Sequence, residues 1–199
     1  MAARVHPGMT GSRARTVGVI SDTHGLLRPE AVVALRGVDA IVHAGDIGTR
    51  DVLDRLARIA PVTAVRGNND RGAWAEALPS TAVLEIGGVR LYVLHSVREL
   101  GLDPRAAGFG AVISGHSHEP RLEERDGVLF FNPGSAGPRR FRLPVAVGRL
   151  TVNGGRVRCR ILELPITRRL LAGRSRAVPT ARHPRRVPGS RPPLGWNGK

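Results

Sequence analysis

The sequence has little cysteine, few aromatic residues and no long hydrophobic run, and each shortage excludes a class of protein. The single cysteine, Cys159, excludes an intramolecular disulfide framework and is typical of proteins from a reducing compartment. No apolar run approaches the roughly eighteen residues that a membrane-spanning helix needs. The first fifteen residues also lack the apolar stretch of a signal peptide. We therefore expect a cytoplasmic protein that makes no membrane contact.

Acidic residues are missing from both ends of the chain, so most of its positive charge lies there. The net charge of +15 divides into +3 for residues 1–15, +3 for residues 16–164 and +9 for residues 165–199. The last segment is rich in proline, glycine and arginine and has no sustained hydrophobic period. We therefore expect a flexible basic N-terminal extension (1–15), one folded domain (16–164) and a disordered basic tail (165–199).

The basic ends are expected to bind nucleic acid or another polyanion weakly and without sequence preference, because arginines displace counterions from phosphates. A dedicated nucleic-acid-binding protein is disfavoured, since the central segment is close to neutral and no aromatic platform interleaves with the basic tail. Assembly of identical copies is left open by the sequence.

Hydrophobic patterning predicts alternating strands and helices at first, and mostly strands afterwards. In the first half, strands are expected over 16–20, 40–44 and 62–65, with helices near 29–36 and 49–59 between them. Later strands are expected over 82–86, 89–94, 112–114, 128–131, 145–150 and 157–162, with hairpin turns at 87–88 and 153–155. This order predicts an α/β protein in which two mixed β-sheets lie face to face with helices outside.

Residues of metal-ligand type follow five of the expected strands. In chain order they are Asp22-Thr23-His24, Gly45-Asp46, Gly67-Asn68-Asn69-Asp70, His95 and Gly115-His116-Ser117-His118. Functional groups of α/β sheets gather beyond the carboxyl ends of strands, so these side chains are expected to converge. Each motif alone is weakly specific, whereas the ordered set is highly specific. Carboxylate, imidazole and amide ligands together suit Mn, Fe, Co or Zn better than calcium or magnesium.

The ordered motifs SDTHG, HAGD, RGNND, a strand-terminal histidine and GHSH resemble those of the calcineurin-like metallophosphoesterase superfamily, above all its small bacterial and archaeal phosphodiesterase branch. The segment FNPGS at residues 131–135 is also similar to that branch. The resemblance covers about residues 16–164 and implies a four-layer αββα sandwich. It further implies a binuclear centre that hydrolyses phosphodiesters by attack of a metal-activated hydroxide. Two divalent ions are implied, with Mn²⁺ expected first and Fe, Zn, Co or Ni as alternatives.

The resemblance assigns seven residues to the two ions. One ion would take Asp22, His24 and His118, the other would take Asn68, His95 and His116, and Asp46 would bridge them. A shared carboxylate reduces the repulsion between two close dications. The amide of Asn68 would ligate without adding charge, which leaves the site positive enough to bind an anionic phosphate ester.

Asn69 and Asp70 are the candidate catalytic residues. Relatives with a GNHE motif carry a histidine at the place of Asn69, which cannot act as an acid at neutral pH. This difference predicts poor cleavage of esters with poor leaving groups. Many relatives also carry a second histidine two residues after His95, where this chain has Val97. For Asp70, the alternatives are orienting a ligand and capping the segment that follows.

Supporting roles are expected for three further residues, namely His43, Asn132 and Ser135, through hydrogen bonds to the ligands or their loops. Arg66 is expected to bind the substrate phosphate. A structural core histidine, a plain Asn-Pro-Gly turn and a surface arginine are the alternatives that remain open. For the arginines at 139, 140 and 142, a solvated loop is favoured over a substrate-facing rim.

Three functions compete with a phosphodiesterase: a phosphomonoesterase, a non-catalytic scaffold of the same fold, and the nucleic-acid-binding protein already disfavoured. Retention of all seven expected ligands argues against the scaffold. The choice between diester and monoester substrates is not decided by the residues.

Overall fold

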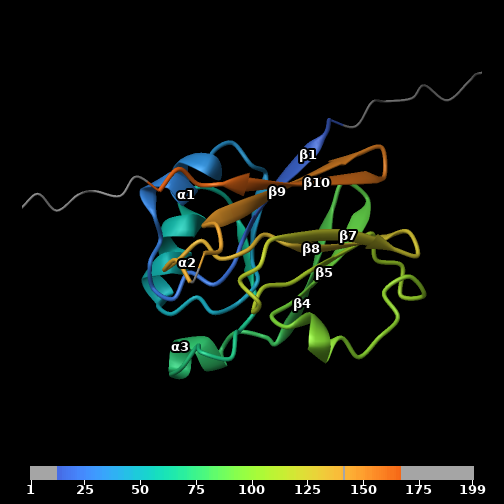
Figure 1. Cartoon of the computed structure of the whole chain (residues 1–199). Coiled ribbons are helices and arrows are strands. Elements are labelled where there is room, and N and C mark those ends of the chain that lie inside the picture. Colours follow the sequence, from blue (N-terminus) through green and yellow to red (C-terminus); the bar gives the residue numbers. More distant parts are fainter. Residues whose placement is uncertain (1–12, 141, 167–199) are drawn as a thin grey trace, which may run out of the picture. The chain divides into compact units, whose positions relative to one another are not determined.

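Two five-stranded mixed β-sheets are formed by the part of the chain that the structure, a computed structural model, describes: residues 13–140 and 142–166. The expected fold class, an α/β protein with two mixed sheets, is thereby confirmed (Figure 1). Residues 1–12 and 167–199 lie outside the description, so the expected flexible extension and disordered tail stay predictions. No helix among the described residues is long and apolar enough to cross a membrane.

The first sheet has the strand order β10-β9-β1-β2-β3. Its parallel strands are β1 (Arg15–Ile20), β2 (Ala40–His43) and β3 (Val62–Ala64), connected by helices α1 (Pro29–Ala34) and α2 (Arg50–Ala57). The antiparallel strands β9 (Ala146–Asn153) and β10 (Arg156–Glu163) complete it. All four residues of β2 are buried, as expected of a strand covered on both faces.

The second sheet has the order β4-β5-β6-β8-β7. Its strands are β4 (Thr81–Ile86), β5 (Val89–Leu94), β6 (Ala111–Ile113), β7 (Arg121–Arg125) and β8 (Val128–Asn132). The three inner strands β5, β6 and β8 run parallel, and the two edge strands run antiparallel to their neighbours. The parallel strands of both sheets therefore end in loops that can share one site.

The two sheets lie face to face across an apolar layer. Val17, Val19 and Val42 of the first sheet join Leu91, Val93, Ile113 and Phe131 of the second in one buried cluster. Gly148 in β9 permits this close packing, because a Cβ there would collide with the Phe131 ring.

Helical cover differs between the two sheets. Helices α1 and α2 cover the outer face of the first sheet, burying Leu35 and Leu56 (Figure 1). Among the described residues, the outer face of the second sheet carries instead the 3₁₀ turn η1 (Val97–Glu99) and the loop that follows it, with a small cluster around Val112. A short helix, α3 (Ala73–Glu76), follows the site loop after β3. Part of the outer face is thus left open, next to the strand ends.

Candidate metal centre

Five of the seven expected ligands have a left-handed backbone. The φ angles are 53° at Asp22, 46° at His24, 53° at Asp46, 69° at His116 and 60° at His118. Among the other described non-glycine residues, only Asp126 has a positive φ. Such a conformation costs on the order of 1–3 kcal/mol per residue and clusters at functional sites. The left-handed backbone turns the chain sharply after each strand, so that the side chains of the expected ligands point at a common centre.

The ligands reach this centre from five strand ends. Asp22 follows β1, Asp46 follows β2 and Asn68 follows β3, all in the first sheet. His95 follows β5, while His116 and His118 follow β6, both in the second sheet. The strand-end placement predicted from the sequence is confirmed, and both sheets contribute to it.

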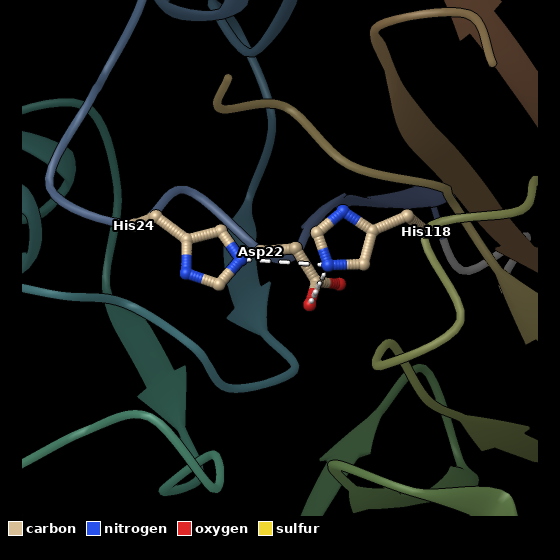
Figure 2. Close-up of side chains that lie close together, drawn as sticks. All are labelled: Asp22, His24 and His118. Atoms are coloured by element: carbon tan, nitrogen blue, oxygen red, sulfur yellow. Dashed lines mark hydrogen bonds and ion pairs between the residues drawn. The ribbon is translucent and has the colours of Figure 1, made fainter. Parts of the chain in front are cut away.

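Asp22, His24 and His118 form the first cluster (Figure 2). The Nε2 atoms of His24 and His118 lie 3.4 Å apart, and the rings are stacked with centroids 5.2 Å apart. His118 Nε2 lies 3.3 Å from Asp22 Oδ1. Two imidazole nitrogens and one carboxylate oxygen thus face one point, which is the donor set expected for a borderline dication.

Asn68, His95 and His116 form the second cluster. The side-chain oxygen of Asn68 lies 3.0 Å from His95 Nε2 and 3.0 Å from His116 Nδ1. The other ring nitrogen of His95, Nδ1, lies 2.7 Å from the carbonyl oxygen of Ala44. That bond assigns the proton to Nδ1 and leaves Nε2 free to ligate.

Asp46 links the two clusters. Its Oδ2 lies 3.9 Å from His24 Nε2 and its Oδ1 lies 3.5 Å from His95 Nε2, so each oxygen faces one cluster. Asp22 also belongs to two groups of converging ligand atoms, one with His24 and His118 and one with Asp46 and His95. All seven residues expected from the sequence are therefore brought together.

A dication fits this set of donors. Asp22 is fully buried, and its Oδ1 has no hydrogen-bond partner among the described residues. Burial raises the pKa of Asp22 to about 6. An isolated buried carboxylate oxygen is costly unless a cation or a donor compensates it, and a metal ion held with His24 and His118 would supply that charge.

The histidines of the first cluster are held neutral, as metal ligation requires. Burial lowers the pKa of His118 to about 4, and the charge of Arg140 acts in the same direction. Burial likewise lowers the pKa of His24. For Asp46, burial opposes the charged form, but contacts from His95 and Asn69 outweigh it and hold the pKa of this carboxyl well below its usual range.

The three residues expected in supporting roles each contact a ligand loop. Ser135 Oγ donates to the backbone carbonyl of Asp22 at 2.9 Å. Asn132 Nδ2 donates to the carbonyl of Gly115 at 2.7 Å and to Ser117 Oγ at 3.0 Å. These bonds fix the loops that carry the ligands after β1 and β6.

His43 is fully buried beneath the first cluster, and its Nε2 lies 2.9 Å from Thr23 Oγ1. The Thr23 hydroxyl donates to the Ile47 carbonyl at 2.9 Å, so His43 Nε2–H is the donor in the first bond. Burial lowers the pKa of His43 to about 3, which keeps this imidazole neutral. Through this bond His43 positions Thr23, the residue between the expected ligands Asp22 and His24.

Asn69 and Asp70 both make hydrogen bonds that brace the site. The backbone N–H and side-chain amide of Asn69 donate to Asp46 at 2.8 and 2.6 Å. The two oxygens of Asp70 accept the N–H groups of Gly48 and Gly67, each at 2.8 Å. Through these contacts Asn69 and Asp70 position other residues of the site. The catalytic role expected for each of them stays a prediction.

Two of the arginines near the site, Arg66 and Arg140, are both exposed. Arg66 is exposed, and its side chain makes no hydrogen bond to a ligand among the described residues, so its expected substrate role is untested. Arg140 is exposed, in keeping with the solvated loop interpreted from the sequence, and its positive charge helps to lower the pKa of His24 and of His118. Only its place in the fold reveals this, because the surrounding sequence is uniformly rich in arginine.

Ser21 is a supporting residue that sequence reasoning missed. Its Oγ donates to Asp22 Oδ2 at 2.7 Å, and the side chain is fully buried. The only available signal was its place immediately before the ligand in a motif of small polar residues.

The fold is shared with solved structures of phosphoesterases. The family model for the calcineurin-like phosphoesterase superfamily domain matches residues 16–155, and the chain belongs to that superfamily. A probable metallophosphoesterase of Methanothermobacter thermautotrophicus is 36% identical over 171 residues, which cover 77% of this chain and 96% of that protein. A phosphodiesterase of Methanocaldococcus jannaschii is 29% identical over 139 residues, covering 59% of this chain and 82% of its own length.

Two solved structures illustrate the range of proteins that share the fold. An archaeal phosphodiesterase has a TM-score of 0.62 and 25% identity, covering 74% of this chain and 99% of its own. Vps29 of Entamoeba histolytica, solved with Zn²⁺, has a TM-score of 0.56 and 22% identity, covering 74% and 98%. The superfamily and these relatives support a phosphoesterase hydrolase for this chain.

Proposed function

We propose that this protein is a binuclear metal-dependent phosphodiesterase. The observation that carries the proposal is Asp46, whose two carboxylate oxygens face two separate groups of ligand atoms. Asp22, His24 and His118 would hold one ion, Asn68, His95 and His116 would hold the other, and Asp46 would join them. Mn²⁺ is the proposed metal, with Fe, Zn, Co and Ni as the alternatives.

Two bound dications would supply Lewis acidity, neutralising phosphate charge and lowering the pKa of a water molecule. The protein's own contribution is a site whose carboxylates neutralise only part of the charge of two dications. Asp22 and Asp46 are the only carboxylates among the seven ligands, so two dications would retain about two positive charges at the site. That charge favours an anionic phosphate ester, and Arg140 adds to the positive potential at His118.

The burial of the ligands gives the site a closed and an open side. Asp22, Asp46, His95 and His118 are buried, whereas Asn68 and His116 are exposed. A substrate would therefore approach from the side of Asn68 and His116. The buried side excludes water from the carboxylates and keeps their electrostatic effect strong.

Diesters are favoured over monoesters on two grounds. The relatives include a protein named as a phosphodiesterase, and a solved structure of an archaeal phosphodiesterase shares the fold. The alternatives are a monoesterase and a scaffold, the latter because Vps29 proteins share the fold.

The test is hydrolysis of bis(p-nitrophenyl) phosphate and of p-nitrophenyl phosphate by the full-length protein. Exhaustive chelation should abolish diester hydrolysis, and Mn²⁺ should restore it, with parallel additions of Fe²⁺, Zn²⁺, Co²⁺ and Ni²⁺ ranking the metals. Asp46→Asn should lower both metal content and turnover. The matched control is Asp51→Asn, which alters an exposed carboxylate on α2.

Full activity after chelation, or in Asp46→Asn, would contradict the mechanism. Faster turnover of the monoester than of the diester would identify the protein as a phosphomonoesterase. Stable binding of two metals without turnover of either ester would favour the scaffold.

A further inference from the structure

A pocket of about 370 Å³ opens beside His116 on the outer face of the second sheet. Ser114, Phe130 and Asn132 form its floor, because alternate residues of β8 and the end of β6 point to this face. One side is the η1 turn, with Arg98, which stands where the first sheet has its helices. The pocket therefore begins at a metal ligand and extends away from the metal centre.

The opposite side of the pocket is the charged edge strand β7. Arg121 pairs with Asn132 and Glu123 pairs with Phe130 in the antiparallel register, so their side chains stand on the same face as the floor. Glu123 binds Arg121 at 2.9 Å and Arg125 through two bonds of 2.8 and 2.9 Å. The wall is thus a fixed row of alternating charges.

The guanidinium of Arg125 lies over the Phe130 ring, and both residues line this pocket. The guanidinium carbon of Arg125 lies 4.8 Å from the centroid of the half-buried Phe130 ring. Arg125 donates two hydrogen bonds to the Glu123 carboxylate, which orients the guanidinium. Aromatic and guanidinium planes are the surfaces on which nucleobases stack, whatever the base.

We propose that this pocket binds the nucleoside half of a nucleotide phosphodiester whose phosphate lies at the metal centre. The proposal rests on the phosphodiesterase function proposed above and names its substrate class. Stacking on the guanidinium of Arg125, which the Phe130 ring supports from below, would hold the base. Donors such as Arg98 and acceptors such as Glu119 stand beside the platform and match the mixed donors and acceptors of a nucleoside.

The size and polarity of the pocket support this occupant. Its volume falls within the roughly 300–1,000 Å³ of small-molecule sites, and much of its lining is charged or hydroxyl-bearing. A lipid or alkyl ester would remove water from these charged and hydroxyl groups and offer no hydrogen bonds in its place, which is costly. A nucleoside would replace the lost water with hydrogen bonds.

The experiment compares two Mn²⁺-dependent substrates that release the same p-nitrophenolate: the p-nitrophenyl ester of thymidine 5′-phosphate and methyl p-nitrophenyl phosphate. The wild-type protein should prefer the nucleotide ester by about tenfold in kcat/KM, mainly through KM. Phe130→Leu should bring this ratio close to one. Phe109→Leu is the matched control, because Phe109 also stacks with an arginine of this sheet, Arg90, but does not line the pocket.

Arg98→Ala is the second variant, since Arg98 is exposed and its loss does not disturb the core. It should also lower the ratio, whereas Arg90→Ala should not. A ratio near one in the wild-type protein, or an unchanged ratio in both pocket variants, would overturn the nucleoside site while leaving the phosphodiesterase intact. Failure to hydrolyse either substrate would instead count against the proposed function, and the two failures are thereby distinguished.

Discussion

Asn69 holds both carboxylate oxygens of Asp46, one through its backbone N–H at 2.8 Å and one through its side-chain amide at 2.6 Å. The same two oxygens face the two ligand clusters. In the sequence, Asn69 stands where some relatives carry a histidine that can act as an acid. In the fold, Asn69 holds the carboxylate of Asp46, the expected bridge, through two hydrogen bonds, which we call the Asn69 clamp.

Removing the side-chain half of this clamp should weaken metal binding. Asn69→Ala keeps the backbone bond but frees one oxygen of Asp46, and loss of such a supporting bond typically costs 10–100-fold in metal affinity. Calorimetric titration of the metal-free protein with Mn²⁺ measures the effect. Asn153→Ala, at the exposed end of β9, is the control. Equal affinities in both variants would show that the clamp has no role in holding metal.

A histidine at position 69 should change the range of leaving groups. Nitrophenolate leaves without a proton, whereas an alkoxide needs one, so Asn69→His should help dialkyl esters relative to diaryl esters. The ratio of kcat/KM for the two ester types measures this change and corrects for any metal lost with the clamp. An unchanged ratio would mean that position 69 has no acid role.

Burial of His43 should make the metal-free protein less stable in mild acid. Its folded pKa is about 3 against 6.5 in the unfolded chain, so the unfolded state alone takes up a proton as pH falls below about 6.5. This lowers the free energy of unfolding by about 1.4 kcal/mol per pH unit between those two values. His43→Gln can keep the bond to Thr23 without titrating.

The measurement is the free energy of urea unfolding at several pH values for both proteins in the presence of chelator. Asp22 has the opposite effect, because its raised pKa favours the folded state as pH falls. Asp22 titrates in both proteins, so the difference between the two curves isolates His43. Parallel curves would contradict a buried neutral imidazole.

Gly67→Ala should prevent assembly of the metal centre. A Cβ at this position would collide with the backbone nitrogen and the carboxylate of Asp46, so the loop after β3 could not approach the loop after β2. We expect at least a tenfold loss of Mn²⁺ affinity with the fold retained, as checked by circular dichroism. Gly101→Ala is the matched control, because nothing lies within 4 Å of a Cβ there. Normal metal binding by Gly67→Ala would show that this close approach is dispensable.

The basic tail should be separable from hydrolysis. Leu164 donates its backbone N–H to Val145 at 2.8 Å, and Ile166 packs against the core beside the helices. A chain that ends at Ile166 should therefore keep its metal and its turnover of small diesters. It should lose most of its salt-sensitive binding to heparin or DNA, measured at two salt concentrations. Loss of metal from the shortened chain would place part of the tail within the fold.

The sequence predicted the elements whose signals are local. Strands such as 40–43 are continuous apolar runs, and the ligands follow them in motifs whose order is itself specific. Prediction failed for β7, because its five residues, RLEER, carry four charges and no apolar alternation. That segment is a strand only because it pairs with β8, and charged edges of this kind protect a sheet from further pairing.

The rest of the site depends on which groups the fold places together. Nothing local to Asn69 indicates that its amide reaches Asp46, and nothing local to Arg140 separates it from the neighbouring arginines. The pocket over Phe130 exists because one sheet face carries a turn and a loop in place of helices, which only the tertiary structure determines. Position in the chain predicted the expected ligands and three residues that support them, whereas the contacts of Asn69 and Ser21 became visible only in three dimensions.

The seven expected ligands come from two layers: Asp22, His24, Asp46 and Asn68 follow strands of the first sheet, and His95, His116 and His118 follow strands of the second. A pair of bound ions would consequently cross-link the sheets at one edge of the apolar layer, so that part of the metal-binding energy becomes folding energy. A chelator would then act on the protein's tertiary structure as well as on its chemistry.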